Sequence, residues 1–463
     1  MINPYIFREY DIRGVMGRDL SPELFRDLGR TFAAHLRAES CREVLTVAVG
    51  RDGRLSSPDL AAGMIEGLVQ GGVRAIDIGL APTPALYFAT YRLEADAGIM
   101  ITGSHNPSDH NGIKMMRAGK AVYGAEIQAL KRRLEAGDNP VVPGGRREQV
   151  DLLEEYVERI AGDFHPGRSL KVVMDCGNGA TGVVAGEILR RLSGVHGEVL
   201  FAEIDGTFPN HHPDPTEPKN LVALAERMRA TGAELGIAFD GDGDRIGAMD
   251  AQGRILWGDL LMILFARDIL SKDPGAAVIG DVKCSQRLFD AVAKAGGEPI
   301  MWKTGHSLIK TKMRESGAPL AGEMSGHLFF ADRYYGFDDA LYAAMRLLEL
   351  AVARPGPLMD ELANLPESFA SPELRIPCPD EQKFIIMERI LARLRDAGAT
   401  LSDIDGARVR VPDGWWLLRV SNTQPILVAR AEAQSPERLQ AILQEVAALL
   451  AAEGVAFPAW QAE

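Results

Sequence analysis

The sequence predicts an α/β protein with three related α/β domains, whose sheets are mixed and mostly parallel, and a C-terminal α+β domain. Three observations predict this fold. The chain has 463 residues, enough for about three domains of average size. One pattern of strand, polar loop, helix and second strand occurs three times. This pattern stops after about residue 366, where a different one begins.

The repeated unit begins with an apolar strand at residues 44–49, 171–176 and 276–282. A short polar loop and a helix follow in each copy, and then a second apolar strand. In the first copy, Ser57 and Pro58 predict the start of the helix, because serine is a favoured N-cap and proline suits the first helical turn. Strands that alternate with helices predict right-handed crossovers and a mostly parallel sheet.

Each unit continues into another apolar strand that ends in a polar, glycine-bearing loop. These segments are residues 98–107 (GIMITGSHNP), 236–245 (GIAFDGDGDR) and 319–327 (PLAGEMSGH). Ligands of open α/β sheets bind at the carboxyl ends of the strands. We therefore expect three loops from three domains to face one shared cleft.

The last part of the chain has a different pattern. Residues 415–433 are predicted to form a strand, a polar loop and another strand. Ser435 and Pro436 then predict the start of an amphipathic helix that ends near Ala452. This arrangement is typical of an antiparallel α+β domain. We place the four domains at residues 1–150, 151–254, 255–366 and 367–463.

Composition excludes several classes of protein. The formal net charge of −13 argues against nonspecific nucleic-acid or membrane partners, which require positive charge. The four cysteines lie far apart in the sequence, which disfavours a zinc site or a disulfide framework and favours a reducing compartment. The N-terminal residues do not resemble a signal peptide, and no apolar run approaches the about 20 residues of a membrane span. We expect a cytoplasmic monomer.

The segment DGDGDR carries three alternating carboxylates directly after an apolar strand. Asp240, Asp242 and Asp244 are followed by Arg245. Carboxylates in a tight turn can converge on one hard cation and leave room for phosphate and water, as Mg²⁺ prefers. An EF-hand is excluded, because it requires Gly at the sixth position and Glu at the twelfth, where this chain has Arg245 and Ala251. The alternative is a solvated acidic turn, but the three charges repel one another unless a cation is present.

The loop TGSHNP contains Ser104, a candidate nucleophile. A hydroxyl nucleophile needs a base or an electrophile nearby, and Lys114 or a metal ion could supply one. The alternative is an ordinary turn, since Ser, Asn and Pro are all turn residues. No G-x-S-x-G nucleophile elbow is present.

Two further loops carry polar groups suited to a sugar phosphate. In GEMSGH, Glu323 and Ser325 can hold vicinal sugar hydroxyls. The alternative for His327 in the same segment is a structural histidine. In RVSNTQP, the guanidinium of Arg419 and the nearby hydroxyls and turn amides suit a phosphate dianion. The alternative for RVSNTQP is a hairpin turn with an exposed arginine.

Another glycine pattern suggests a different enzyme. Gly177, Gly179 and Gly182 spell G-x-G-x-x-G between a strand and a helix, and Glu203 and Asp205 follow about 20 residues later. This is the dinucleotide-binding fingerprint, so an NAD(P)-dependent oxidoreductase is an alternative. It leaves the other loops without a role. A non-catalytic sugar-phosphate-binding protein is a third possibility, and it would bind its ligand without turnover.

Together, the motifs resemble the α-D-phosphohexomutase superfamily. TGSHNP, DGDGDR, GEMSGH and RVSNTQP occur in the family's order, and the similarity begins at FREYDIRG (residues 7–14), so it covers nearly the whole chain. The chain looks most like the bacterial phosphomannomutase/phosphoglucomutase group, since phosphoglucosamine mutases tend to contain TASHNP and GEQSGH. The resemblance implies four domains around a central cleft.

The resemblance also implies roles for individual residues. Ser104 would be the phosphoserine, and its phosphate would share Mg²⁺ with Asp240, Asp242 and Asp244. Glu323 and Ser325 would bind the sugar's O3 and O4. The phosphate that is not transferred would be held by Arg419, Ser421, Asn422 and Thr423. Other matching cleft positions are Tyr10, Arg13, His105, Lys114, Arg245, Lys283, His306 and His327. Of these, Lys114 and His327 are candidates for proton transfer.

The implied reaction interconverts hexose 1-phosphates and hexose 6-phosphates. The serine phosphate passes to the free hydroxyl of the substrate, the resulting hexose 1,6-bisphosphate turns around, and its other phosphate returns to Ser104. The bisphosphate would also act as activator. Glucose and mannose differ at C2, so contacts to O3 and O4 would admit both. A mobile fourth domain could open the cleft during turnover.

Overall fold

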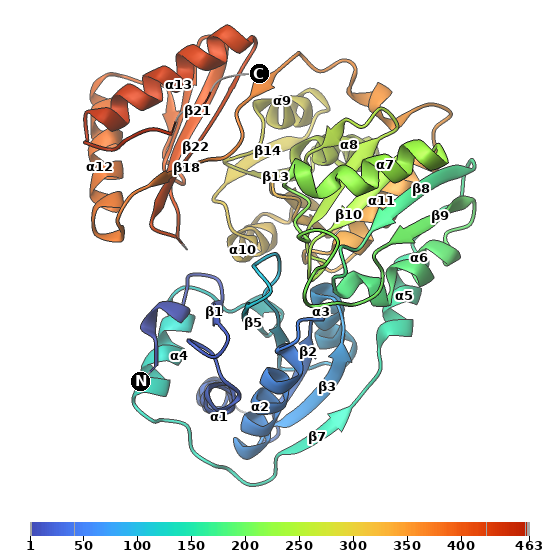
Figure 1. The fold of residues 1–463 in the computed structure, drawn as a ribbon, viewed down its shortest axis with the longest axis vertical. Coiled ribbons are helices and arrows are strands. Elements are labelled where there is room, and N and C mark those ends of the chain that lie inside the picture. The colour runs from blue at the N-terminus through green and yellow to red at the C-terminus, as the bar shows by residue number, and fades with distance from the viewer. Residues whose placement is uncertain (1, 41, 423, 459, 461–463) are drawn as a thin grey trace.

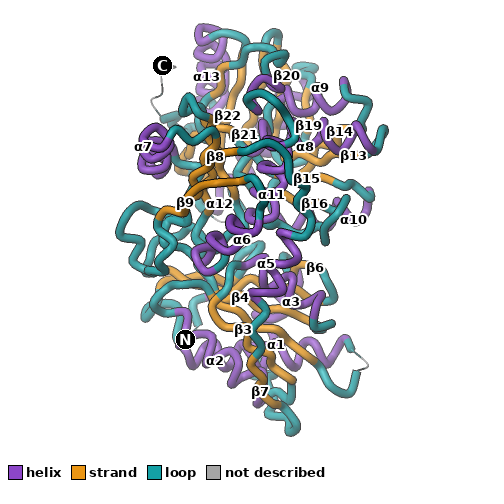
Figure 2. The backbone as a smooth tube through the Cα atoms, turned by 90° about the vertical axis from the view of Figure 1, so that its right-hand side faces the viewer, coloured by secondary structure: helices purple, strands orange, loops and turns teal. Residues whose placement is uncertain are grey.

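The computed structural model of the protein describes residues 2–40, 42–422, 424–458 and 460. In these residues, four sheets built from successive parts of the chain form three α/β domains and an antiparallel C-terminal domain (Figure 1). The predicted fold class is therefore confirmed. The side view shows the first domain at one end of the long axis (Figure 2). No helix in the described ranges is long and apolar enough to cross a membrane.

The first domain contains a mixed sheet in the order β1-β5-β4-β2-β3-β7, with β6 paired to β5. Its strands are β1 (Ile12–Val15), β2 (Thr46–Arg51), β3 (Arg74–Leu80), β4 (Ala97–Ile101), β5 (His110–Arg117), β6 (Lys120–Ala121) and β7 (Arg146–Gln149). Its helices are α1 (Pro22–Glu39), α2 (Ser57–Gln70), α3 (Thr83–Arg92) and α4 (Ala125–Glu135).

The second domain has the sheet order β12-β11-β10-β8-β9. Its strands are β8 (Leu170–Asp175), β9 (Val195–Leu200), β10 (Leu235–Phe239), β11 (Ile246–Asp250) and β12 (Ile255–Leu256). Its helices are α5 (Leu153–Ala161), α6 (Ala185–Arg191) and α7 (Val222–Thr231).

The third domain has the sheet order β14-β13-β15-β16. Its strands are β13 (Ala277–Asp281), β14 (Glu298–Trp302), β15 (Leu320–Gly322) and β16 (Leu328–Phe330). Its helices are α8 (Gly258–Lys272), α9 (Gln286–Lys294), α10 (His306–Ser316) and α11 (Ala340–Val352). Short 3₁₀ helices elsewhere in the chain are η1 (Pro4–Ile6), η2 (Ala180–Val183), η3 (Pro218–Leu221) and η4 (Leu358–Leu362).

The fourth domain has an antiparallel sheet in the order β17-β22-β21-β20-β19, with β18 also paired to β22. Its strands are β17 (Phe369–Ala370), β18 (Leu374–Pro377), β19 (Leu401–Ser402), β20 (Ala407–Val411), β21 (Gly414–Val420) and β22 (Ile426–Ala433). Its helices are α12 (Asp380–Asp396) and α13 (Pro436–Ala451), and the N-cap of α13 is Ser435 as predicted.

The three α/β domains place their polar loops at equivalent positions. In each, a central strand (β2, β8 or β13) has parallel neighbours, and one of these neighbours forms an antiparallel pair with the strand after it. The loops β4–β5, β10–β11 and β15–β16 join these antiparallel pairs and contain TGSHNP, DGDGDR and GEMSGH. The repeat therefore explains why three different chemistries occupy corresponding positions.

The hydrophobic cores separate the fourth domain from the others. One buried cluster unites the second and third domains with α3 of the first. The fourth domain has its own core, and an apolar contact with the third domain consists of Val282 against Trp415 and Leu417. Buried hydrogen bonds also cross this boundary, from Arg408 to the carbonyls of Val282 and Cys284 and from Ser285 to Glu432. The contact is therefore largely polar, as contacts between separable domains are.

One local prediction was wrong. The N-cap of α2 is Ser56, which makes no side-chain cap bond, and Ser57 lies inside the helix. The hydroxyl of Ser57 instead donates to Asp52 over 2.5 Å. This carboxylate, five residues earlier in the chain, takes the hydroxyl that would otherwise cap the helix.

Candidate active site

Ser104 occupies a strained position at the tip of β4. Its backbone φ is +50°, in the left-handed region that few residues other than glycine adopt. The side chain is 2% exposed. Its Oγ donates to Oδ2 of Asp240 over 2.9 Å and lies 3.1 Å from Nδ1 of His105. The predicted nucleophile is thus held against the predicted metal-binding loop of the second domain.

The guanidinium of Arg54 holds the Ser104 loop in this shape. It donates to the carbonyl oxygens of Ser104 (2.7 Å), Asn106 (2.6 Å), Pro107 (2.5 Å) and His110 (2.9 Å). Arg54 is 1% exposed. Arg54 belongs to none of the motifs and was not predicted; the available signal was its position in another loop that follows a central strand of the sheet.

The acidic loop gathers three fully buried carboxylates. Ligand oxygens of Asp240, Asp242 and Asp244 lie within 4.8 Å of one another, and each residue is 0% exposed. Nζ of Lys114 donates to Asp242 over 2.7 Å and also pairs with Asp244. Thr83 donates to the same Asp242 oxygen over 2.6 Å, which ties the loop to the first domain. Thr83 was also missed, since it carries no motif of its own.

The electrostatics of this loop fit a divalent cation. Burial and the carboxylates of Asp242 and Asp244 raise the pKa of Asp240 well above its usual value. Burial lowers the pKa of Lys114, but the aspartates outweigh this effect and hold it above its usual value. Oδ1 of Asp242 and of Asp244 has no hydrogen-bond partner among the described residues. These buried oxygens are the hard ligands that Mg²⁺ prefers.

The third loop presents Glu323 and Ser325. Oε1 of Glu323 accepts the backbone N–H of Gly305 over 2.8 Å, and Oε2 accepts the hydroxyl of Ser325 over 3.0 Å. Burial raises the pKa of Glu323, but electrostatic interactions with His327 and Lys283 and the hydrogen bond from Gly305 outweigh it and lower the pKa. The ionised carboxylate can therefore accept hydrogen bonds from sugar hydroxyls.

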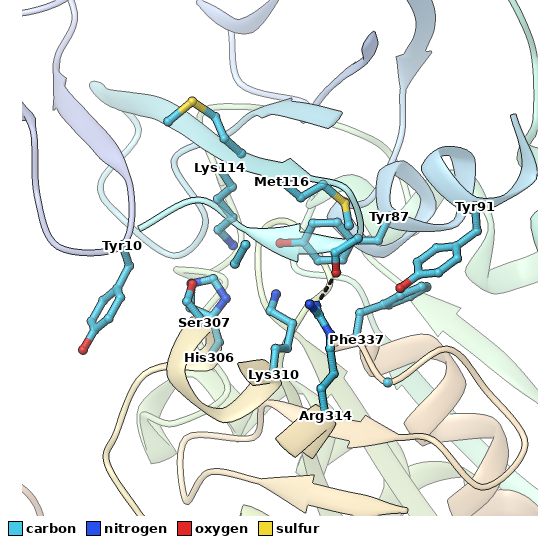
Figure 3. A pocket seen from close by; sticks show the side chains of 14 residues that line it. Tyr10, Tyr87, Tyr91, Lys114, Met116, His306, Ser307, Lys310, Arg314 and Phe337 are labelled. Carbon is cyan, nitrogen blue, oxygen red and sulfur yellow. Dashed lines mark hydrogen bonds between the residues drawn. The ribbon is translucent and has the colours of Figure 1, made fainter. Parts of the chain in front are cut away.

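His327 and Arg245 connect the second and third loops. Nε of Arg245 donates to Nε2 of His327 over 2.9 Å. The ring of His327 stacks on that of His306, with centroids 5.4 Å apart and planes inclined by 16°. Figure 3 shows Lys114 on β5 pointing toward His306 and Lys310 on α10. The proton-transfer candidates of the first and third domains therefore face the same region.

The fourth domain reaches the others through the loop after β21. Nδ2 of Asn422 donates to the Tyr10 hydroxyl over 3.0 Å, and that hydroxyl donates to the carbonyl of Thr304 over 3.2 Å. Nε of Arg419 donates to Asp405 over 3.0 Å. Ser421 lies in the same loop, and Thr423 lies outside the described residues.

Lys383, Lys283 and Arg13 are three further buried cations. Lys383 donates to the carbonyl oxygens of Ser421 (2.7 Å) and Gln424 (3.0 Å), and so supports the loop. It was missed because it lies on α12, 38 residues away in the sequence. Nζ of Lys283 lies 3.3 Å from Glu373. Arg13 pairs with Asp11 over 2.6 Å.

The G-x-G-x-x-G segment packs against the protein itself. The amide of Ala180 donates to the carbonyl of Gly241 over 2.9 Å. A Cβ on Gly179 would lie 2.8 Å from that same carbonyl, and one on Gly182 would lie 2.1 Å from the carbonyl of Ala202. Asp205 binds Thr207 instead of standing free. The glycines allow close backbone packing that supports the acidic loop, which argues against the oxidoreductase alternative.

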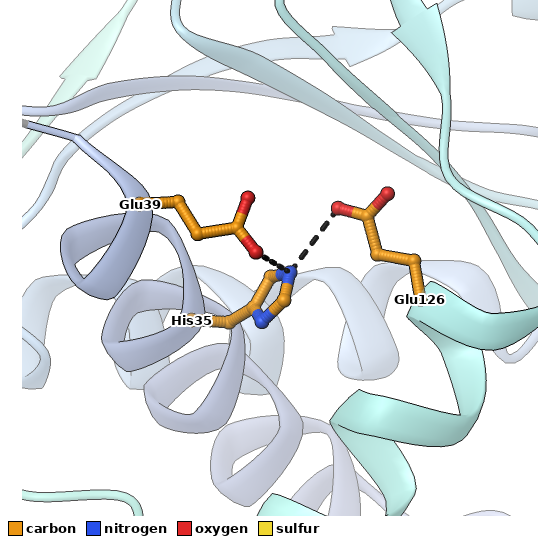
Figure 4. A group of neighbouring side chains, drawn as sticks. All are labelled: His35, Glu39 and Glu126. Atoms are coloured by element: carbon orange, nitrogen blue, oxygen red, sulfur yellow. Dashed lines mark hydrogen bonds and ion pairs between the residues drawn. The ribbon is translucent and has the colours of Figure 1, made fainter.

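A second acidic group lies on the first domain, between α1 and α4 (Figure 4). Nε2 of His35 lies 3.1 Å from Glu126 and 3.8 Å from Glu39. Arg117 pairs with both carboxylates, each over 2.8 Å. Arg117 offsets one of the two carboxylate charges and pairs with both, so we interpret the group as an ion-pair network that joins the two helices.

Sequence profiles of four domains match the chain. The phosphoglucomutase/phosphomannomutase alpha/beta/alpha domains I, II and III match residues 4–140, 154–253 and 257–369, and the C-terminal domain of the same family matches residues 373–449.

Whole-chain comparisons agree with these profiles. The phosphomannomutase/phosphoglucomutase of Pseudomonas putida is 49% identical over 438 residues, or 94% of this chain and 93% of that protein. The crystal structure of a phosphoglucomutase/phosphomannomutase family protein from Burkholderia thailandensis is 44% identical, with a TM-score of 0.92 over 99% of this chain and 100% of that one. The fold also matches an N-acetylphosphoglucosamine mutase of Aspergillus fumigatus, solved with GlcNAc-6P and magnesium, at 13% identity and a TM-score of 0.61 over 97% of this chain and 96% of that one.

Proposed function

The chain belongs to the phosphoglucomutase/phosphomannomutase family and interconverts hexose 1- and 6-phosphates, and we propose that it does so through a phosphoserine at Ser104. The observation that carries this proposal is the 2.9 Å hydrogen bond between Oγ of Ser104 and Asp240. It joins a buried hydroxyl to a buried carboxylate cluster, an arrangement suited to phosphoryl transfer through positioning and charge neutralisation.

Asp240, Asp242 and Asp244 would hold Mg²⁺ beside the serine phosphate. The buried oxygens of Asp242 and Asp244 that lack hydrogen-bond partners among the described residues support this assignment. When bound, the metal supplies positive charge to the oxygens of the transferring group. Lys114, which bridges Asp242 and Asp244, adds a second positive charge from the first domain.

Two residues would move the protons of the transfer. His327 takes the proton of the attacking sugar hydroxyl through Nε2, while the sugar oxygen bonds to phosphorus. The bond between phosphorus and Oγ of Ser104 breaks, and its electron pair stays on Oγ. Lys114 donates a proton to this oxygen, because its raised pKa keeps it an ammonium. The reverse transfers recharge Ser104 from the other end of the sugar.

The remaining residues would bind the sugar and its distant phosphate. Glu323 and Ser325 bind O3 and O4, which stay in equivalent places when the hexose 1,6-bisphosphate turns around. Arg419, Ser421, Asn422 and Thr423 hold the phosphate that is not being transferred. Tyr10, Arg13, His105, Arg245, Lys283 and His306 line the same region. The separate core of the fourth domain supports its movement during this turn.

Two measurements on the same reaction mixture test this proposal. The protein is incubated with mannose 1-phosphate or glucose 1-phosphate, Mg²⁺ and a trace of the matching 1,6-bisphosphate, and ³¹P NMR follows the 6-phosphate. We expect product from both sugars and a phosphate on Ser104 by mass spectrometry. Ligand binding without turnover would support the non-catalytic alternative. The monomeric state and the cytoplasmic location stay predictions from the sequence.

A further inference from the structure

Asp338 is buried at the centre of a group of basic side chains in the third domain. It is 0% exposed, and a backbone pairing with Phe329 fixes its position beside β16. Oδ1 accepts a hydrogen bond from Nζ of Lys310 over 2.8 Å. Oδ2 lies 3.1 Å from Nδ1 of His327 and 3.4 Å from Nδ1 of His306. One carboxylate therefore faces a lysine and two histidines.

The opposite nitrogen of His327 has a partner that identifies the ring's tautomer. Nε of Arg245 donates to Nε2 of His327 over 2.9 Å. A guanidinium has donors and no acceptor, so Nε2 must present its lone pair. In a neutral imidazole the proton then resides on Nδ1, an assignment made from the hydrogen-bond network. The nearest carboxylate oxygen is that of Asp338, since the Asp244 oxygen lies farther away, at 3.7 Å.

The surrounding charges keep this carboxylate ionised. Burial raises the pKa of Asp338, but the charge of Lys310 and the ring N–H groups of the two histidines outweigh burial and hold the pKa well below its usual value. Burial and Lys310 lower the pKa of His306, so that ring is a neutral neighbour. The anion beside Nδ1 of His327 is therefore permanent at neutral pH.

We propose that Asp338 is a positioning residue that acts through His327. This inference rests on the proposed role of His327 as the general base. Nδ1 of His327 and Oδ2 of Asp338 lie 3.1 Å apart, and neither has an aligned hydrogen-bond partner among the described residues. A small rotation of the ring lets the carboxylate accept the Nδ1–H and so keeps Nε2 unprotonated. During transfer, the O–H bond of the sugar hydroxyl breaks and its proton joins Nε2, while the sugar oxygen bonds to phosphorus. Asp338 then stabilises the imidazolium. Arg245 must release Nε2 first, and a substrate phosphate oxygen offers its guanidinium a stronger partner.

The central test is Asp338→Asn, which keeps the size of the side chain and replaces an acceptor by an amide. We expect kcat to fall about 100-fold, because a general base contributes roughly 10²–10⁴-fold, while KM changes less than about threefold. In a His327→Ala background, the same substitution should cost less than about twofold, since both changes remove one function. Additive losses in this cycle would overturn the inference.

A second readout does not depend on turnover. With ¹⁵N-labelled histidine, the signals that disappear in His327→Ala are assigned to His327. In the wild-type protein, Nδ1 should have the chemical shift of a protonated nitrogen and Nε2 that of an unprotonated one. Asp338→Asn should move both shifts toward each other. Unchanged shifts in the variant would overturn the role of Asp338 in fixing the tautomer.

Matched variants distinguish the positioning role of Asp338 from an effect on protein stability. Asp339→Asn alters the adjacent buried carboxylate, which faces Tyr156 and Tyr334, and should leave kcat unchanged. If Asp338→Asn fails to fold because Lys310 is left unpaired, Lys310→Met/Asp338→Asn restores the charge balance and should show the same loss of kcat. A near wild-type kcat for His327→Ala would refute the base role itself. An impaired His327→Ala with a normal Asp338→Asn would refute only the present inference.

Discussion

Oγ of Ser104 donates a hydrogen bond to Oδ2 of Asp240 over 2.9 Å, although 136 residues separate them in the sequence. The two residues come from equivalent loops of two repeated domains. The hydroxyl already points at the carboxylate cluster, so a phosphate on Ser104 would need little rearrangement to reach a metal ion held there.

Ser104→Ala should remove the acceptor of the phosphoryl group. We expect mutase activity to fall roughly 10³-fold or more, since loss of a nucleophile removes the pathway, with little change in the melting temperature. Ser108→Ala is a matched control, because Ser108 is exposed in the same loop. Wild-type turnover by Ser104→Ala, purified free of other mutases, would contradict the assignment.

Asp242→Asn should weaken the metal site. The substitution removes one charge of the cluster and one carboxylate partner of Lys114. We expect activity to fall at least roughly 10- to 100-fold, the loss typical for residues that only support a metal ligand. EDTA should abolish wild-type turnover and Mg²⁺ should restore it, with a higher Mg²⁺ requirement in the variant. Asp205→Asn, whose side chain accepts hydrogen bonds from the nearby Thr207, should behave as wild type. Full activity after chelation would rule out the metal.

Arg54→Lys should disturb the phosphoserine loop without touching the substrate. A lysine cannot donate to four carbonyls at once, so we expect a loss of about 1.5–3 kcal/mol in the free energy of unfolding. The kcat should fall while KM changes little, because Ser104 leaves its strained position. Urea unfolding and steady-state kinetics measure both effects. Arg51→Lys, in β2, is the matched control. Equal behaviour of the two variants would refute the role of Arg54 in holding the Ser104 loop.

Arg419→Ala should weaken binding of the phosphate that is not transferred, in both directions of the reaction. Arg419, Ser421, Asn422 and Thr423 are here called the phosphate clamp. Loss of one charge-assisted contact costs about 1.5–3 kcal/mol, or about 10- to 150-fold in kcat/KM. Arg410→Ala, an exposed arginine on β20, should leave kcat/KM unchanged. The measurement is kcat/KM for the 1-phosphate and for the 6-phosphate. A loss confined to one of them would argue against a shared clamp.

Asp339 should make stability depend on pH. Burial raises the pKa of this carboxyl from 3.8 to about 6, despite hydrogen bonds from Tyr342 N–H and two tyrosine hydroxyls. The folded state therefore binds this proton more tightly than the unfolded state. The free energy of unfolding should fall as pH rises from about 4 to about 6, by on the order of 3 kcal/mol. Asp339→Asn should remove this part of the slope in urea titrations, and an unchanged slope would contradict the shift.

The sequence by itself determined the repeated architecture and the order of the reactive loops. Strand and helix periodicity is local, so the three units and the strand–loop–strand of the fourth domain were predictable. The chemical roles of the side chains in TGSHNP, DGDGDR, GEMSGH and RVSNTQP were also predictable, because a hydroxyl, carboxylate or guanidinium group has the same chemistry in any fold. The N-cap of α13 followed from Ser435 alone, whereas that of α2 did not, because Asp52 takes the hydroxyl of Ser57.

Only the tertiary structure decided which charges meet. Lys114 neutralises Asp242 and Asp244 across a domain boundary, and Asp338 joins His327 to Lys310. Arg54 and Lys383 have no motif, and their carbonyl partners lie 38 to 56 residues away. Such pairings depend on distances between segments that fold onto one another, and no local pattern encodes these distances. The same packing turned the G-x-G-x-x-G segment into a support for the acidic loop.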